Sequence, residues 1–256
     1  MNAQKNTAWL GKDHLHFDRL PSTNDYLKQH AKALSHGTVV TADYQTAGKG
    51  RVGRTWQDSA RKGLAFSVLL RPPSVHHTQL LPLVCALGVK SSLEMLCGVN
   101  AQIKWPNDIV LNGKKVCGIL CEGVLLGDAS YAICGIGLNV LQETQDFASF
   151  GLDHATSLLI ETGKAYPLKD ITAVLMSRLE HYYDHLIAEG FDPLLAQYRQ
   201  ACITLGRDVR VLQNGSEREG RAVGLSPNGA LLVDFGGTIV EVNAGEASVR
   251  GLYGYV

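Results

Sequence analysis

The sequence has no excess of either charge, since its 24 lysines and arginines balance 24 aspartates and glutamates. A neutral chain creates no overall field that would draw it to nucleic acid or to anionic lipid, so we predict no nucleic acid and no membrane among its partners. The first twenty residues contain no apolar run of signal-peptide length. We therefore expect a cytoplasmic protein in which any attraction for anions is local.

Patterns typical of metal sites and disulfides are missing too. The six cysteines form no C-x-x-C pair and lie mostly in apolar runs, which favours buried, reduced thiols over disulfides or structural zinc. The nine histidines include no H-E-x-x-H motif. We predict no metal site built from protein ligands, whereas a hard cation such as Mg2+ can arrive with phosphate groups.

What is present suits a globular protein with one large domain and one small one. The 256 residues are 45% apolar, enough for a sizeable core. In the first part, short apolar runs and helical stretches do not alternate as βαβ units, which predicts an α+β fold with a mixed sheet. After Gly206, short apolar runs alternate with glycine-containing turns, as in a small β-barrel. We divide the chain into residues 1–205 and 206–256.

Capping and periodicity predict the individual elements. Ser22-Thr23-Asn24-Asp25 has the form of a capping box, and Leu27, Ala31 and Leu34 follow at helical spacing, so a helix is expected to begin there. Further helices are predicted at residues 80–96, with Pro82 in the first turn, and at 168–188 and 193–203. Strands are predicted at 39–42, 64–70, 109–111, 116–126, 131–140, 208–212, 221–225, 231–235 and 239–242.

The most informative stretch is residues 48–56, GKGRVGRTW, which places three cations among three glycines. Glycine lets the backbone approach a ligand closely, and the cations attract anions, so we predict an anion site rather than a solvated basic turn. The pattern also satisfies G-x-G-x-x-G. A dinucleotide site is disfavoured, because no apolar helical stripe follows and no acidic residue lies about twenty positions on.

Two further segments carry chemistry only in combination. Residues 104–108, KWPND, have good turn residues beside a tryptophan that fits a core equally well. In residues 114–120, KKVCGIL, strand alternation places Lys115 on one face with Cys117 and Ile119, opposite Gly118. Lys115 then points inward at the start of a strand, or it is a solvated hairpin lysine.

Together, in this order and spacing, the three motifs resemble the catalytic domain of bacterial biotin protein ligases. The resemblance extends to Ser22-Thr23-Asn24, to Gln45, to GIGLN at residues 135–139 and to the small C-terminal β domain. It implies a mixed sheet related to class II aminoacyl-tRNA synthetases and an SH3-like C-terminal domain. It also implies that ATP converts biotin to biotinyl-5'-AMP, from which biotin passes to a lysine of a biotin carboxyl carrier protein.

The resemblance assigns the site residues as follows. Biotin binding falls to Ser22, Thr23, Asn24, Gln45, Gly48, Lys49, Lys115, Gly118 and Gly135. ATP or adenylate binding falls to Arg51, Arg54, Trp56, Asn107 and Asn139, and catalysis to Lys115, Arg51 and Asp108. Asp108 is expected to orient the incoming lysine amine or a Mg2+ ion. The implied small molecules are ATP, Mg2+ and the substrate biotin, and no residue is assigned as a metal ligand.

The sequence departs from the family pattern in a few places. Lys49 stands where arginine is usual, and Cys117 where alanine is common. About fourteen residues precede the first family-like strand, too few for a DNA-reading module, so we expect a single-function ligase without the N-terminal DNA-binding domain. Two alternatives stay open: a lipoate or octanoate ligase or transferase on the same scaffold, and a non-catalytic nucleotide-binding module. The oligomeric state is not predicted.

Overall fold

A computed structural model describes residues 7–57, 59–126, 129–213, 215–244, 247–251 and 255 of the chain. A seven-stranded mixed sheet forms its centre, in the order β1-β2-β3-β7-β6-β5-β4, and only β1 and β2 run parallel among the described strands. Its strands are β1 (His14–Phe17), β2 (Val39–Ala42), β3 (Gly63–Leu70), β4 (Gln102–Lys104), β5 (Asp108–Leu111), β6 (Lys114–Leu126) and β7 (Ala129–Asn139).

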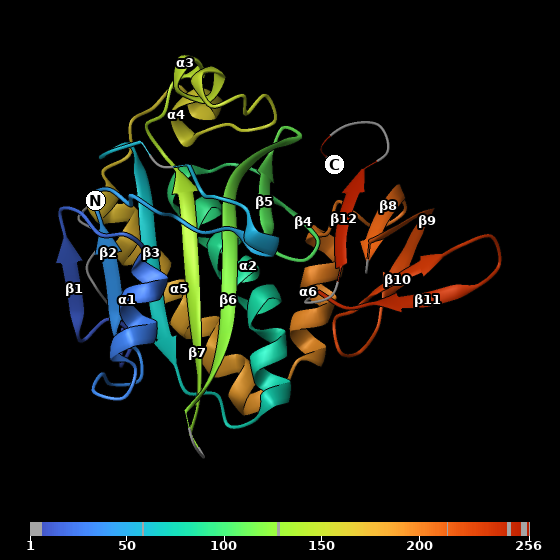
Figure 1. Ribbon diagram of the computed structural model, residues 1–256, viewed down its shortest axis with the longest axis horizontal. Coiled ribbons are helices and arrows are strands. Elements are labelled where there is room, and N and C mark those ends of the chain that lie inside the picture. The colour runs from blue at the N-terminus through green and yellow to red at the C-terminus, as the bar shows by residue number, and fades with distance from the viewer. Residues whose placement is uncertain are drawn as a thin grey trace.

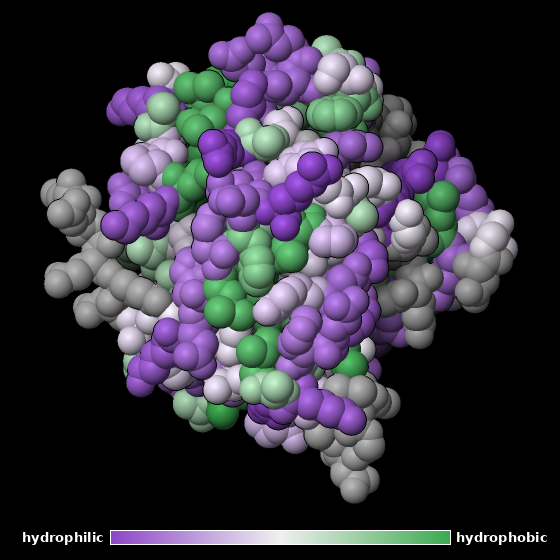
Figure 2. Space-filling model, turned by 60° about the vertical axis from the view of Figure 1, so that its left-hand side comes forward, coloured by the Kyte–Doolittle hydropathy of each residue, from purple (hydrophilic) through white to green (hydrophobic). Residues whose placement is uncertain are grey.

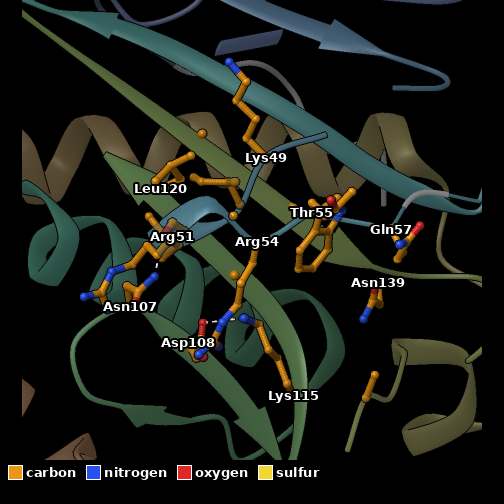
Figure 3. Close-up of a pocket in the computed structure, with 18 of the residues that line it drawn as sticks. Lys49, Arg51, Arg54, Thr55, Gln57, Asn107, Asp108, Lys115, Leu120 and Asn139 are labelled. Carbon is orange, nitrogen blue, oxygen red and sulfur yellow. Dashed lines mark hydrogen bonds and ion pairs between the residues drawn. The ribbon is translucent and has the colours of Figure 1, made fainter. Parts of the chain in front are cut away.

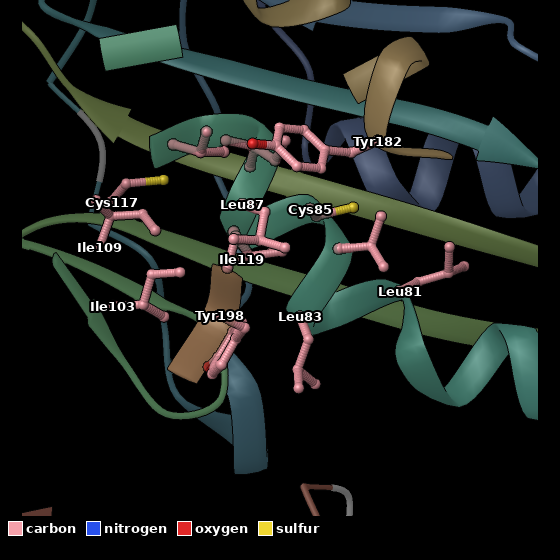
Figure 4. Packing of buried hydrophobic residues seen from close by; sticks show 14 of the residues in the cluster. Leu81, Leu83, Cys85, Leu87, Ile103, Ile109, Cys117, Ile119, Tyr182 and Tyr198 are labelled. Carbon is pink, nitrogen blue, oxygen red and sulfur yellow. The ribbon is translucent and has the colours of Figure 1, made fainter. Parts of the chain in front are cut away.

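Helices cover both faces of this sheet (Figure 1). On one face, α2 (Val75–Cys97) and α5 (Leu168–Glu189) bury the main hydrophobic cluster. Figure 4 shows side chains of α2, Leu83 and Leu87 among them, beside Ile119 of β6. On the other face, α1 (Thr23–His30) packs a smaller cluster around Leu27. This second face is only partly covered, which leaves room for a site.

Helix α2 is long and apolar enough to cross a membrane by length and composition alone. It is also 61% buried over its most apolar window, in contact with the sheet and with α5, so it is the core helix of this fold. Figure 2 shows one face of the molecule, where hydrophobic groups form small areas between hydrophilic ones. Such scattered apolar groups are ordinary on a protein surface.

Most predicted elements are confirmed, and the main differences are the limits of two helices and the presence of two further short helices. The helix predicted at 80–96 begins earlier, at Val75, because the Ser74 side chain caps it by accepting from His77 N, and Pro82 therefore lies inside the helix rather than in its first turn. Helix α1 ends at His30, so Leu34 lies beyond it and packs against the smaller cluster from a turn. Two short helices were not predicted, α3 (Thr144–Ser149) and α4 (Leu158–Thr162).

Helix α6 (Asp192–Ala201) leads into a separate antiparallel sheet of order β11-β10-β9-β8-β12. Its strands are β8 (Asp208–Gln213), β9 (Ser216–Leu225), β10 (Leu231–Asp234), β11 (Ile239–Val242) and β12 (Ala247–Gly251), the last not predicted. This sheet shares the main hydrophobic cluster with the large domain. Trp105 also donates its ring N–H to Gly229 O at 3.0 Å, so the small domain is fixed beside the end of β4. The α+β class is confirmed.

Candidate active site

A cavity of about 530 Å³ opens on the face of the sheet that α1 leaves partly bare. All three sequence motifs meet there, and every predicted site residue except Gly48 lines it. Six cationic side chains surround it: Lys49, Arg51, Arg54, Lys104, Lys115 and Arg250. Among the described lining residues, Asp108 is the single carboxylate. The predicted local attraction for anions is therefore present in a chain of zero net charge.

The glycine-rich stretch folds as a hairpin over the sheet. Trp56 N donates to Gly48 O at 2.9 Å, Gly50 N donates to Arg54 O at 2.7 Å, and a short 3-10 turn covers Arg51–Gly53 between them. Gly48 lies at the neck of this hairpin, where an added Cβ would come within 2.6 Å of Trp56 O. Its lack of a side chain thus serves the closing of the loop, rather than the lining of the main cavity.

Lys49 points away from the rest of the loop's cations (Figure 3). Its Nζ lies 2.7 Å from Asp25 Oδ1 of α1, and this hydrogen bond raises the pKa of the lysine. The side chain therefore ties the loop to α1. A flexible point charge is sufficient for such a contact, which is why lysine in place of arginine is compatible with the site.

Asp108 and Lys115 form the corner of the cavity where the charges meet. Lys115 Nζ lies 2.6 Å from Asp108 Oδ1, and the Tyr255 hydroxyl donates to Asp108 Oδ2. Burial alone would raise the pKa of the Asp108 carboxyl, but the Lys115 ammonium and the Tyr255 hydroxyl hold it below its ordinary value. Asp108 is therefore ionised near neutral pH, and its charge is matched by the lysine.

Arg51 is held at its side of the cavity by two contacts. It donates to Asn107 Oδ1 at 2.8 Å and to Ala244 O of the small domain. Asn107 in turn donates through Nδ2 to Ile119 O on β6. Burial lowers the pKa of the Arg51 guanidinium from its ordinary value, and the guanidinium remains charged at neutral pH.

The side chain of Lys115 reaches the cavity by a route that alternation did not predict. Ile109 pairs with Cys117 but Val110 pairs with Lys115, so the register shifts by one residue at Val116. This bulge turns Lys115 onto the cavity face, where its Nζ comes within 2.9 Å of the Cβ position of Gly118. The predicted sharing of a face with Cys117 is therefore wrong, because Cys117 lies in the core on the other side of the sheet.

Glycines of β6 and β7 make the floor of the cavity, and each gives room to a different side chain. Gly118 and Gly137 are direct cross-strand partners, and the Trp56 ring lies over both of them. A Cβ on Gly135 would overlap the Asn24 amide. Gly135 lines the cavity, and its nearest neighbour there is the Asn24 side chain.

The end of the cavity beneath α1 is neutral. Ser22 Oγ caps the helix, accepting from Asp25 N, and Gln45 Oε1 accepts from Thr23 N at 2.9 Å. Asn24 Oδ1 lies 2.6 Å from Ser67 Oγ of β3. At the opposite end, Asn139 donates to Thr156 O at 3.0 Å. Each of these polar side chains is fixed by the fold before any ligand arrives.

Several lining residues were not singled out by sequence reasoning. Lys104 is only 8% exposed, and its Nζ lies 3.7 Å from the centre of the Tyr255 ring. Burial lowers the pKa of Lys104 to about 8, against the opposing effect of Asp108. Lys104 stood in the KWPND motif and could have been found there. Tyr255 gave no signal, because only the fold brings the C-terminal segment to Asp108.

The donor set at this site does not suit a metal ion held by the protein alone. The one carboxylate among the described lining residues is already engaged by Lys115 and Tyr255. A Mg2+ ion fits only together with the phosphate oxygens of a nucleotide. Elsewhere, the fold brings the thiols of Cys85, Cys121 and Cys134 within 4.8 Å of one another, which their sequence spacing did not reveal. All six cysteines are free thiols, as predicted.

Comparisons with known proteins show which family the chain resembles. Residues 16–139 match the biotin/lipoate A/B protein ligase family, and residues 204–250 match the biotin protein ligase C-terminal domain. The chain is 33% identical over 231 residues to the bifunctional ligase/repressor BirA of Bacillus subtilis, which covers 89% of this chain and 71% of that protein. It is 34% identical over 219 residues to the biotin–[acetyl-CoA-carboxylase] ligase of Mycobacterium tuberculosis, 82% of this chain and 78% of that protein.

Solved structures point to the same family as the sequence comparisons. The biotin protein ligase of Aquifex aeolicus in complex with biotin and ATP superposes with a TM-score of 0.81 at 32% identity, covering 94% of this chain and 99% of that one. The two family matches together span most of the sequence and both described sheets. The chain belongs to the biotin protein ligase family.

Proposed function

We propose that the chain activates biotin with ATP to form biotinyl-5'-AMP and diphosphate, and then transfers the biotinyl group to a lysine of a biotin carboxyl carrier protein. The observation that carries the proposal is the division of one cavity into a neutral, hydrogen-bonding end and an end with five of the six cations, Lys49 standing apart. The neutral end suits the uncharged ureido ring of biotin. The cationic end suits the triphosphate.

The first step joins two anions. A carboxylic acid has a pKa of about 4, so the biotin carboxylate is already ionised and needs no general base. The obstacle is repulsion between that carboxylate and the phosphate oxygens, which preorganised cations offset. Lys115 lines the cavity beside Asp108, and in the proposed step its ammonium contacts both reactants. Arg51 and Arg54 face the phosphates from the hairpin.

The second step needs a neutral amine on the carrier lysine. Asp108 is the carboxylate that faces the reacting centre, and it is ionised because its pKa lies below the ordinary value. Its charge can hold the incoming amine and accept a proton as the new amide forms, while the bond between the biotinyl carbonyl and the phosphate breaks and AMP leaves. Mg2+, when bound, would neutralise the phosphates, and Asp108 is the single carboxylate that the described lining residues offer. We place this reaction in the cytoplasm.

Diphosphate release tests the proposal. The protein is incubated with ATP and Mg2+ and with either biotin or lipoate, and diphosphate is measured. We expect release with biotin. Release with lipoate alone would identify a lipoate ligase on the same scaffold, and no release with either acid would indicate a non-catalytic nucleotide-binding module. Transfer is followed separately, as incorporation of biotin into a purified carrier domain.

A further inference from the structure

A continuous line of hydrogen bonds runs behind the neutral end of the cavity, and it contains three residues without an assigned role: Lys28, Glu122 and Ser67. Lys28 Nζ donates to Glu122 Oε1 at 2.7 Å, and Asn24 Nδ2 donates to Glu122 Oε2 at 2.9 Å. Ser67 Oγ lies 2.6 Å from Asn24 Oδ1 and 2.7 Å from Thr23 Oγ1. The line thus joins a charged pair on α1 and β6 to a hydroxyl that lines the cavity.

The chemistry of each group fixes where every proton lies. A carboxylate only accepts hydrogen bonds, so Glu122 requires the NH2 side of the Asn24 amide and leaves the amide oxygen toward Ser67. That oxygen carries no proton, so the Ser67 hydroxyl must donate its single proton there. The Ser67 oxygen can then only accept from Thr23. If any one of these directions were reversed, two lone pairs would face each other at under 3 Å.

The Thr23 hydroxyl therefore has its proton directed into the protein. Gln45 Oε1 lies 3.1 Å from the same hydroxyl oxygen and is a second acceptor within reach, but Ser67 gives its only proton to Asn24 and so needs the Thr23 proton for the 2.7 Å contact between the two hydroxyls. What Thr23 offers to the cavity is a lone pair. Thr23 is only 3% exposed. If the ligand gives this oxygen no hydrogen bond, water therefore cannot easily reach the oxygen to supply one, and binding is weakened.

We infer that Glu122 and Ser67 are positioning residues that set the polarity of Thr23, so that the neutral end accepts a hydrogen bond from a ring N–H of its substrate. The inference rests on the proposed function and specifies how the acid is selected. The cyclic urea of biotin carries N–H groups, whereas the dithiolane ring of lipoate has none. Glu122, which is not among the residues lining the cavity, thereby determines which acid is selected.

The test compares biotin with two isosteric analogues in which one ureido N–H at a time is replaced by oxygen. Dissociation constants are measured by calorimetry for the wild type, Glu122→Gln and Ser67→Ala. In the wild type we expect one analogue to bind roughly 10- to 100-fold more weakly than biotin, because its ring oxygen faces the Thr23 lone pair. Glutamine at position 122 can donate to Asn24, which allows the amide to flip and the line to reverse. In Glu122→Gln, the ratio of the dissociation constant of this analogue to that of biotin is then expected to fall to about threefold or less.

Glu94→Gln is the matched control, since Glu94 also pairs with a lysine, Lys90, at 2.6 Å but lies on α2 away from the cavity. This variant should leave the ratio of the two dissociation constants unchanged. Melting temperatures of all variants show whether a loss of binding reflects a loss of folding. A wild-type ratio near one, or a high ratio that persists in both Glu122→Gln and Ser67→Ala, overturns the inference. Absence of any biotin binding by the wild type contradicts the proposed function instead.

Discussion

The two ends of the cavity achieve affinity by different physical means. Around Thr23, Asn24 and Gln45, neutral groups are held by hydrogen bonds to one another, and none of the described lining residues there carries a net charge apart from Lys49, whose amine is paired with Asp25. Around Lys104 and Lys115, cations face Asp108, the single carboxylate in the part of the lining that the structure describes. In the proposed mechanism, the neutral end selects by the direction of its donors and acceptors, and the cationic end lowers the barrier to joining two anions. Each end should therefore fail in its own way.

The largest effect is expected from Lys115→Ala. Loss of one preorganised charge beside the reacting atoms should lower kcat for adenylate formation about 100- to 1000-fold, with a smaller change in biotin affinity. Single-turnover diphosphate release measures the first quantity and calorimetry the second. Lys114→Ala is the control, because Lys114 is the exposed neighbour on the same strand. Equal rates in wild type and Lys115→Ala would remove this lysine from the mechanism.

Gly135→Ala should damage the neutral end alone. The added methyl group overlaps the Asn24 amide, which must then leave its contacts with Ser67 and Glu122. We expect KM for biotin to rise by roughly tenfold or more while KM for ATP changes little. Gly123→Ala on β6 is the matched control, because its added Cβ would lie 3.6 Å from the Thr78 side chain, which is an ordinary van der Waals contact. A parallel rise in both KM values would show that the two ends are not separable.

Lys104 should make the cationic end sensitive to pH. Burial lowers its pKa to about 8, so it is charged below that pH and becomes neutral as the pH rises through it. The affinity for ATP is therefore expected to fall by roughly tenfold between pH 7 and pH 9.5, whereas biotin affinity is unchanged. In Lys104→Arg the guanidinium stays charged over this range, and the fall should disappear. ATP dissociation constants that rise equally in both proteins between pH 7 and pH 9.5 would assign the effect to another group.

The difference between the two ends also bears on what the sequence could reveal. The motifs themselves indicated the anion-binding loop, because turn residues and glycines are read locally. The shared site of the loop, KWPND and Lys115 was predicted from the resemblance of the three motifs to a family. The orientation of Lys115 required a bulge at Val116, and a one-residue shift in register leaves no mark in residue pattern. Ser67 and Glu122 come together through the pairing of distant strands, and Tyr255 reaches Asp108 only through the path of the C-terminal segment. Composition and spacing encode neither.

The smallest effect concerns the hairpin that covers both ends, residues 48–56. Its internal hydrogen bonds are few, and its tie to α1 is the exposed Lys49–Asp25 pair, so it should open locally in the absence of substrate. A bound adenylate must be shielded from water, and its contacts would favour the closed hairpin. We expect amide exchange at these residues to slow by about three- to tenfold when biotin and ATP are added, measured by mass spectrometry. The turn at Gly236 and Gly237 in the small domain lies outside the cavity lining and should exchange at the same rate with and without substrates.

The same exchange measurement can show which end of the cavity closes the hairpin. Gly135→Ala should reduce the protection that biotin gives to residues 48–56, whereas Lys115→Ala should leave this protection largely intact. The reverse order would mean that the cationic end, and not the neutral one, closes the site.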